Sequence, residues 1–233
     1  SHRLEEIGKI SDYVSVLKDG KLMATKETDS INPSEMIKLM VGRELKDIFE
    51  DEVGEINSNE VLLEVKNLKN SEFFNDINFN IKKGEIVGFS GLIGAGRTEL
   101  ALTLFGYYKA EGGKVILDGE ELKISNPTEA IKSGIVYVSE ERREKGLFTE
   151  MSVRNNLISP NLDLVSKSGV LNNDQISQLT KECIDQLNIK TNSDETYVLK
   201  LSGGNQQKIA LGKWLPKNPK LLIIDEPTRG VDV

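Results

Sequence analysis

The sequence predicts an α/β fold with a mainly parallel sheet, on three observations. From Val61 onward, strand-like and helix-like segments alternate, as they do when helical crossovers join parallel strands. A glycine-rich turn follows the apolar run 85–90, and a second apolar run, 221–224, ends in two acidic residues. Both features put polar groups at the carboxyl ends of strands, where open α/β sheets bind ligands.

The N-terminal stretch, residues 1–43, predicts a hairpin followed by a helix. Residues 13–17 and 21–25 have strand patterns and are separated by Asp19-Gly20, a tight-turn pair. Asn32 is suited to cap a helix that starts at Pro33. This stretch has too few apolar residues to fold alone, so we expect it to be the tail of a preceding domain.

Residues 44–60 predict a solvated linker. Seven of them are Asp or Glu and one is Lys, and like charges at this density favour an extended chain.

The region 61–233 supplies the alternating elements. Its apolar patterns predict strands at 61–65, 77–81, 85–90, 114–117, 135–138 and 221–224, and helices at 97–105, 173–187 and 209–215. Cys183, the single cysteine, lies on the apolar side of helix 173–187 and is predicted to be a small core residue. Trp214 is predicted to belong to the core rather than to a ligand site.

Residues 91–98, Gly-Leu-Ile-Gly-Ala-Gly-Arg-Thr, have the spacing of a phosphate-binding P-loop. The glycines let successive backbone N–H groups point into one concavity, and the following helix adds its positive end. The Thr98 hydroxyl can bind Mg²⁺. Arg97 stands where lysine is usual, and its broad planar guanidinium fits less easily among phosphates than a compact ammonium. By itself this loop could be a tight turn only.

Two further segments add to this signal. Asp225 and Glu226 end the strand 221–224, where Asp225 can hold Mg²⁺ and Glu226 can orient or deprotonate an attacking water. Ser202-Gly203-Gly204 opens an amphipathic helix and makes a second anion-binding helix start. Taken alone, Asp225-Glu226 could be a chance acid pair in a turn, and Ser202-Gly203-Gly204 could be an ordinary helix cap. The presence of both segments together with the P-loop disfavours these alternatives.

In this order the three motifs resemble those of ABC-transporter ATPases. Residues 91–99, 139–142, 201–208 and 226–233 resemble the second nucleotide-binding half of the double-domain ATPases of monosaccharide importers, the ribose and galactose type. Residues 1–7 and 40–45 resemble the end of the first half. The resemblance implies a RecA-like P-loop NTPase core with an antiparallel β subdomain near residues 61–90 and 114–118 and a helical subdomain at about 147–215. It also implies that residues 61–233 are a second half cut after the loop that follows Asp225-Glu226, within a longer subunit.

The site that the resemblance implies binds ATP and Mg²⁺. Catalytic roles fall to Glu226 and to His2, the switch histidine of the first half. Metal-binding roles fall to Thr98, Asp225 and Glu140, although Glu140 replaces the family's glutamine. The implied nucleotide-binding residues are Gly91, Gly94, Ala95, Gly96, Arg97, Thr98, Glu99, Ser202, Gly203, Gly204 and Gln206. Phe73 or Phe74 is expected either to stack on adenine or to lie in the core.

The implied function is ATP hydrolysis that drives sugar uptake through separate membrane subunits. Expected partners are another nucleotide-binding half or a second copy, the transmembrane permease subunits and, indirectly, a solute-binding protein, at the cytoplasmic side of the membrane. The isolated chain is expected to be inactive. The net charge of −7, from 30 basic and 37 acidic residues, disfavours a nucleic-acid partner. Alternatives are a nucleoside or autoinducer importer, a soluble ABC ATPase acting on ribosomes or DNA, and a non-hydrolysing nucleotide-binding module.

Overall fold

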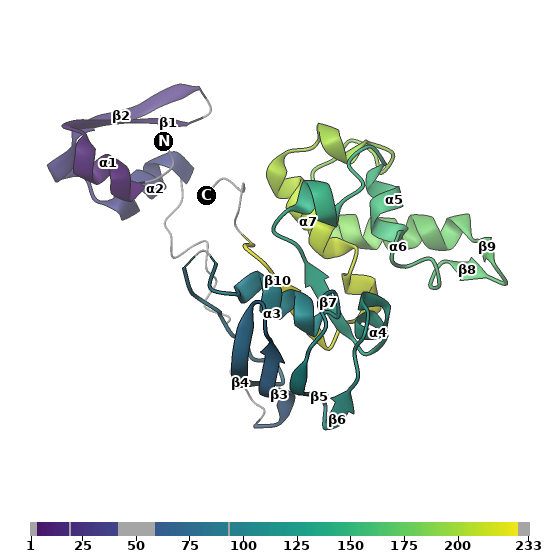
Figure 1. Ribbon diagram of the computed structural model, residues 1–233. Helices are drawn as coiled ribbons and strands as arrows, with labels where there is room; N and C mark the ends of the chain where they lie inside the picture. The colour runs from purple at the N-terminus through teal and green to yellow at the C-terminus, as the bar shows by residue number, and fades with distance from the viewer. Residues whose placement is uncertain (1–3, 19, 42–58, 93, 228–233) are drawn as a thin grey trace. The chain divides into compact units, whose positions relative to one another are not determined.

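The computed structural model describes residues 4–18, 20–41, 59–92 and 94–227 (Figure 1). Contacts divide the chain into two compact units that meet in the sequence at residues 55 and 56. The predicted acidic linker, apart from residues 59 and 60, lies outside the described residues, as does His2. No helix among the described residues combines the length and the apolar character needed to cross a bilayer.

The N-terminal unit contains the predicted hairpin and helix. β1 (Tyr13–Lys18) pairs antiparallel with β2 (Lys21–Glu27), and the short 3₁₀ turn η1 (Thr28–Ser30) leads to α2 (Pro33–Val41). The Asn32 side chain caps α2, because its Oδ1 accepts the Glu35 N–H at 2.8 Å. A further helix, α1 (Leu4–Ile10), was not predicted; it is short and has Gly8 in its middle, which weakens the helical pattern.

The second unit contains an antiparallel four-stranded sheet and a separate parallel pair of strands, together with a short hairpin. β3 (Val61–Asn70), β4 (Phe74–Lys82), β5 (Gly112–Leu117) and β6 (Glu120–Leu122) form an antiparallel sheet in the order β4-β3-β5-β6 (Figure 1). β7 (Ile135–Val138) and β10 (Leu221–Ile224) pair in parallel. The antiparallel β part that the resemblance implied near residues 61–90 and 114–118 is therefore confirmed for β3 to β6, in which the short connections β3–β4 and β5–β6 favour antiparallel pairing. Among the described strands, the parallel pairing expected from the alternation of strands and helices is limited to β7 and β10.

Residues 85–90 form no strand, contrary to the prediction. Ile86 is 93% exposed, and Val87 and Phe89 are also exposed. These residues and β10 line one cavity of about 780 Å³. A strand needs a neighbouring backbone about 4.8 Å away to complete its ladder, and no described strand pairs with this segment. The apolar run alone therefore did not decide its conformation.

The helices of the second unit fall into two groups. α3 (Arg97–Leu104) and α4 (Pro127–Lys132) pack with the sheets, where Leu100, Leu104 and Ala130 join the core of β3. α5 (Val153–Ile158), α6 (Asn173–Gln186) and α7 (Gly203–Gly212) share a second core. Short elements connect them: the π-helix η3 (Arg142–Gly146), the hairpin β8 (Ser166–Lys167) and β9 (Val170–Leu171), and the 3₁₀ turns η4 (Val198–Lys200) and η5 (Leu215–Lys217).

Cys183 belongs to this second core, as predicted. It is 3% exposed, and its thiol donates to the Gly212 carbonyl at an Sγ–O distance of 3.7 Å. Burial raises the pKa of the Cys183 thiol to about 11, because a thiolate is poorly solvated among apolar side chains. Trp214 packs against the same core from its edge.

A pair of glycine variants tests the packing of the antiparallel sheet. Gly113 and Gly119 have φ of 87° and 83°, but an added Cβ would lie 2.4 Å from the Asn67 carbonyl oxygen at Gly113 and in open space at Gly119. Gly119→Ala should cost about 1 kcal/mol through backbone strain alone. Gly113→Ala should lower the free energy of unfolding by about 1–3 kcal/mol more. Urea unfolding followed by circular dichroism measures both, and equal losses would contradict the assigned strand register.

Candidate functional site

The P-loop, residues 91–98, is shaped by glycines in the left-handed region. Gly94 and Gly96 have φ of 82° and 83°, and Gly96 is the N-cap of α3. The Ala95 N–H donates to the Leu92 carbonyl at 3.1 Å and closes a turn. A Cβ at Gly96 would lie 3.0 Å from the Phe73 carbonyl oxygen, so glycine is needed there for two reasons. Backbone around Gly94 and Ala95 is exposed ahead of a helix start, an arrangement that favours anions.

Asp225 is the meeting point of three segments. Its Oδ2 accepts the Thr98 hydroxyl at 2.8 Å and the Tyr137 hydroxyl at 2.9 Å. Its N–H donates to the Val138 carbonyl at 3.0 Å and extends the β7–β10 ladder by one bond. The structure therefore brings the predicted metal residues Thr98 and Asp225 into direct contact. Tyr137 was missed in the sequence, although its place one residue before the end of the strand 135–138 put it at the ligand edge of the sheet.

Arg97 and Glu226 form an ion pair across the same site, with 3.3 Å between Arg97 Nη1 and Glu226 Oε1. Arg97 is 34% and Glu226 43% exposed at the side chain, so the pair is only a weak restraint. Glu226 also has a φ of 46°, which is uncommon outside glycine. Arg97, which stands where a P-loop usually has lysine, thus contacts Glu226, the carboxylate predicted to activate water. Glu99, the next P-loop residue, is half-buried in the first turn of α3.

Glu140 lines a cavity of about 510 Å³ together with Thr98 and Asp225. A hydroxyl and two carboxylates are hard oxygen donors of the kind Mg²⁺ prefers. In the described part of the chain no three Asp, Glu, His or Cys side chains converge on one point. The residues present therefore suit an ion that keeps waters and takes phosphate oxygens as its other ligands, as Mg²⁺ does at nucleotide sites.

The signature segment, residues 201–208, starts α7. Ser202 is the N-cap and is exposed, and its Oγ accepts the Asn205 side-chain N–H at 2.9 Å. Gly203 and Gly204 form the first helical positions and are partly exposed. Backbone donors and a hydroxyl at a ten-residue helix start can bind phosphate.

Gln206 differs from the rest of the predicted set, because it is fully buried. Its Oε1 accepts the Arg143 Nε–H at 2.9 Å, and its Nε2 donates to the carbonyls of Val198 and Leu201 at 3.1 Å each. These bonds occupy the amide inside the protein, so its assignment as a nucleotide-binding residue is corrected. The sequence held a signal for this, since Gln206 shares a helix face with the buried Ile209 and Ala210.

The two phenylalanines occupy different places. Phe73 lies beside the P-loop, and its ring is 4.8 Å from that of Tyr108 between centroids. Phe74 packs against the apolar core of the sheet. Of the two, Phe73 has the position from which a ring could meet a base.

Lys213 is a partly buried cation that lines the same cavity as Glu140. Its Nζ donates to the Gly146 carbonyl and lies 5.1 Å from the centroid of the Trp214 ring. Burial lowers the pKa of Lys213 to about 8, because the ammonium loses its hydration. This residue also ties η3 to the end of α7.

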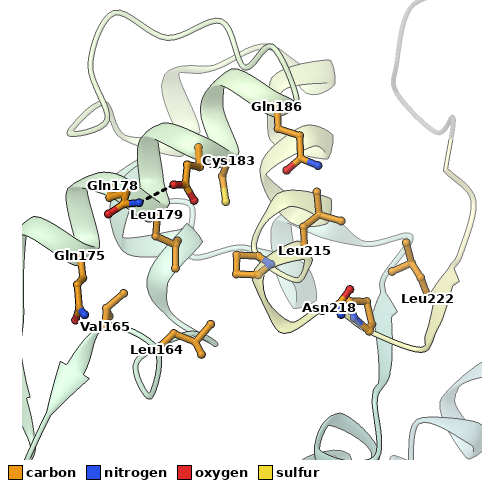
Figure 2. A pocket seen from close by; sticks show the side chains of 13 residues that line it. Leu164, Val165, Gln175, Gln178, Leu179, Cys183, Gln186, Leu215, Asn218 and Leu222 are labelled. Atoms are coloured by element: carbon orange, nitrogen blue, oxygen red, sulfur yellow. Dashed lines mark hydrogen bonds between the residues drawn. The ribbon is translucent and has the colours of Figure 1, made fainter.

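A separate cavity of about 650 Å³ lies in the helical region. Figure 2 shows the side chains of Gln175, Gln178 and Gln186 of α6, and those of Leu215 and Asn218, among the residues that line it. The Gln178 amide donates to Glu182 Oε1 at 2.9 Å. Among the described residues that line it none is basic, and Glu182 adds an acid. This cavity lacks the charge that phosphate binding needs, so we assign the nucleotide to the P-loop side.

Comparison with known proteins agrees with this arrangement. The ABC transporter family model matches residues 74–229. A ribose import ATP-binding protein, RbsA, from Caldanaerobacter subterraneus subsp. tengcongensis is 46% identical, with 100% of this chain and 47% of that protein covered. A putative ribose/galactose/methyl galactoside import ATP-binding protein from Halalkalibacterium halodurans is 43% identical, with 100% and 44% covered. The chain spans about half the length of these curated relatives.

Solved structures confirm the fold. The cbiO1 protein of Clostridium perfringens, part of the ABC transporter complex cbiONQ, superposes with a TM-score of 0.61 at 25% identity, with 74% of this chain and 68% of that chain covered. A dimeric ATP-binding cassette in a post-hydrolysis state, bound to ADP and Pi, gives a TM-score of 0.60 at 23% identity, with 73% and 76% covered. The ATP-binding-cassette fold predicted from the resemblance is confirmed.

Replacing Gln206 tests the buried network. Gln206→Leu removes the buried amide that accepts from Arg143 and donates to the Leu201 carbonyl and, beside the Leu201 N–H, to the Val198 carbonyl. It should lower the free energy of unfolding by about 2–3 kcal/mol. Gln207→Leu is the matched control, since Gln207 is partly exposed and accepts one bond, from Arg142 at 3.2 Å. Its loss should cost under about 1 kcal/mol. Chemical denaturation of the two variants measures both losses of stability. Similar losses for Gln206→Leu and Gln207→Leu would contradict a bridging role of the Gln206 amide.

The buried ammonium of Lys213 predicts a pH dependence of stability. Below pH 8 both the folded and the unfolded chain carry the proton, so folding bears the full cost of burying the charge. As pH rises from about 8 toward 10.5, the folded state releases the proton first and stability increases. Relative to Lys213→Met, the wild type should therefore gain up to about 3 kcal/mol across this window. Chemical unfolding of the wild type and Lys213→Met at pH 7 and pH 10 measures this gain. If the difference in their free energies of unfolding is the same at both pH values, the pKa of Lys213 is not lowered.

Proposed function

This chain belongs to the ABC transporter family, and from that premise we propose that it is part of the ATP-binding subunit of a sugar-type importer. The observation that carries the proposal is the convergence of Thr98 from the P-loop and Asp225 from β10 on one hydrogen bond of 2.8 Å, because it joins a phosphate-binding loop to a metal-binding carboxylate. We propose ATP as the nucleotide and Mg²⁺ as its metal, with residues 1–43 as the tail of one nucleotide-binding half and 61–233 as most of the second.

In this proposal each group has a physical task. The P-loop backbone and Arg97 bind the phosphates, with Glu99 close by in α3, and Thr98, Asp225 and Glu140 hold Mg²⁺, which neutralises phosphate charge. Glu226 orients the attacking water and accepts its proton, as phosphoryl transfer to water requires. The start of α7, with Ser202, Gly203 and Gly204, would bind nucleotide held by another P-loop, either that of the first half or that of a second copy. His2 would contact a γ-phosphate in the first half.

The two composite sites of the subunit are proposed to be unequal. The signature segment of this chain has an exposed hydroxyl at a helix start, and it would serve the P-loop of the first half. The P-loop of this chain instead carries Arg97, which contacts Glu226 at 3.3 Å. The pair engages one oxygen of the Glu226 carboxylate, and the broad guanidinium would fill space near the phosphates. Since positioning accounts for most of phosphoryl-transfer catalysis, this site should bind nucleotide and turn it over slowly.

The solute and the partners are inferred from the relatives. Their names specify ribose, or ribose, galactose and methyl galactoside, so we propose a monosaccharide as the solute, with permease subunits in the membrane, a solute-binding protein and a position on the cytoplasmic face. The helix α5, capped by Ser152, follows the Glu140 loop and is proposed to help contact the permease. A nucleoside or autoinducer importer is the alternative. Reconstituted transporter should hydrolyse ATP faster with sugar-loaded binding protein, and stimulation by nucleosides alone would favour the alternative.

Two substitutions in the complete subunit test the asymmetry. Ser202→Arg should reduce ATP hydrolysis by about 100-fold, because it blocks the phosphate-facing helix start of the active composite site. Glu226→Gln should reduce it only slightly, because it acts at the slow site, which contributes little of the total turnover. Arg97→Lys should raise turnover if the guanidinium causes the defect. Phosphate release by the reconstituted transporter measures all three, and equal losses from the first two would mean that the sites are equivalent or strictly coupled.

A further inference from the structure

Tyr137 makes a contact that the proposed reaction does not yet explain. Its hydroxyl donates to Asp225 Oδ2 at 2.9 Å, and the Thr98 hydroxyl donates to the same oxygen at 2.8 Å. Two donors therefore hold one oxygen of the carboxylate, and Oδ1 is the oxygen that neither of them engages. These two hydrogen bonds restrict rotation of the carboxylate about its Cβ–Cγ bond, a torsion that is otherwise broadly distributed.

We propose that Tyr137 is a positioning residue that holds the Asp225 carboxylate in the orientation needed to bind the metal of a metal–nucleotide complex. This inference rests on the function proposed above and adds a residue to it. Tyr137 does not act on the nucleotide itself; it acts through Asp225.

The tyrosine is held by the sheet. In the parallel pairing of β7 and β10, Tyr137 stands opposite Ile223 and Val138 opposite Ile224, so Asp225 follows directly at the end of the paired strand. The Asp225 N–H bond to the Val138 carbonyl, at 3.0 Å, fixes the backbone between them. The Tyr137 ring packs against Phe105 with centroids 5.7 Å apart. Both the donor and the acceptor are thus attached to rigid elements.

Tyr137 and Thr98 are not equivalent donors. Thr98 lies in the first turn of the helix that follows the P-loop, so its geometry depends on a loop that contacts nucleotide. Tyr137 lies in the sheet, and its bond to Asp225 needs no part of that loop. A tyrosine hydroxyl is protonated at neutral pH, so Tyr137 can donate this bond under ordinary conditions.

The expected size of the effect follows from metal sites in general. Removing a partner that orients a metal-binding side chain typically weakens metal affinity by about 10–100-fold. Tyr137→Phe removes one hydroxyl and keeps the ring, so the packing against Phe105 is retained. We expect a loss of about tenfold in metal affinity, with little change in nucleotide binding without metal.

The test uses the assembled transporter with the non-hydrolysable nucleotide AMP-PNP and Mn²⁺ as the probe. Free Mn²⁺ is measured by electron paramagnetic resonance, and nucleotide binding is measured separately in EDTA. Tyr137→Phe should weaken one class of Mn²⁺ site and leave binding in EDTA unchanged. Tyr107→Phe is the matched control, because Tyr107 lines the same cavity and is 65% exposed. It should leave both measurements unchanged.

A second background checks that the effect passes through Asp225. In an Asp225→Asn protein, Tyr137→Phe should produce no further loss of Mn²⁺ affinity. An unchanged Mn²⁺ affinity in Tyr137→Phe, or an equal loss of binding in EDTA, would overturn the inference and leave the proposed function standing. If the wild-type transporter binds no Mn²⁺ with the nucleotide, the proposed function and this inference fail together.

Discussion

The parallel pairing of β7 with β10 is the constraint on which the site depends. It sets Ile224 opposite Val138, and the next residue, Asp225, is then held by a backbone bond to Val138. That register places the Asp225 carboxylate within reach of two hydroxyls from other segments, and it leads β7 directly into the Glu140 loop. A slip of one residue would turn Asp225 to the opposite face of the sheet, and no substitution at the P-loop could compensate.

A second set of contacts ties the loop after β7 to the start of α7. Arg143 reaches Gln206, Arg142 reaches Gln207, and Lys213 reaches the Gly146 carbonyl. The amide of Gln206 also holds two carbonyls just ahead of the signature segment. The loop that contains Glu140 and the start of α7, which we proposed to serve different nucleotide sites, are therefore parts of one hydrogen-bonded body. A rotation of the helical region would have to carry the loop with it.

Local chemistry made most of the elements predictable, and long-range pairing made the rest hard to foresee. The P-loop glycines, the acid pair after β10 and the cap at Asn32 depend on neighbours within four residues, and each lies where the sequence indicated. The run 85–90 is apolar enough for a strand, yet a ladder requires a partner that no local pattern supplies. Gln206 was misassigned because a motif records spacing and does not record which helix face is buried. Tyr137 carries no motif, and only the strand register shows what its hydroxyl meets.

The burial of Cys183 has a practical consequence for spectroscopy. The chain has one cysteine, and its thiol is shielded within the helical core with a pKa of about 11. Thiol-reactive dyes and spin labels attack the thiolate, so at neutral pH the native chain should react with them very slowly. A cysteine introduced at an exposed position, for example in place of Ser202, would then carry the label almost alone. This chain therefore offers a nearly silent background for a label placed at a chosen position within it, without first removing its own sulfur.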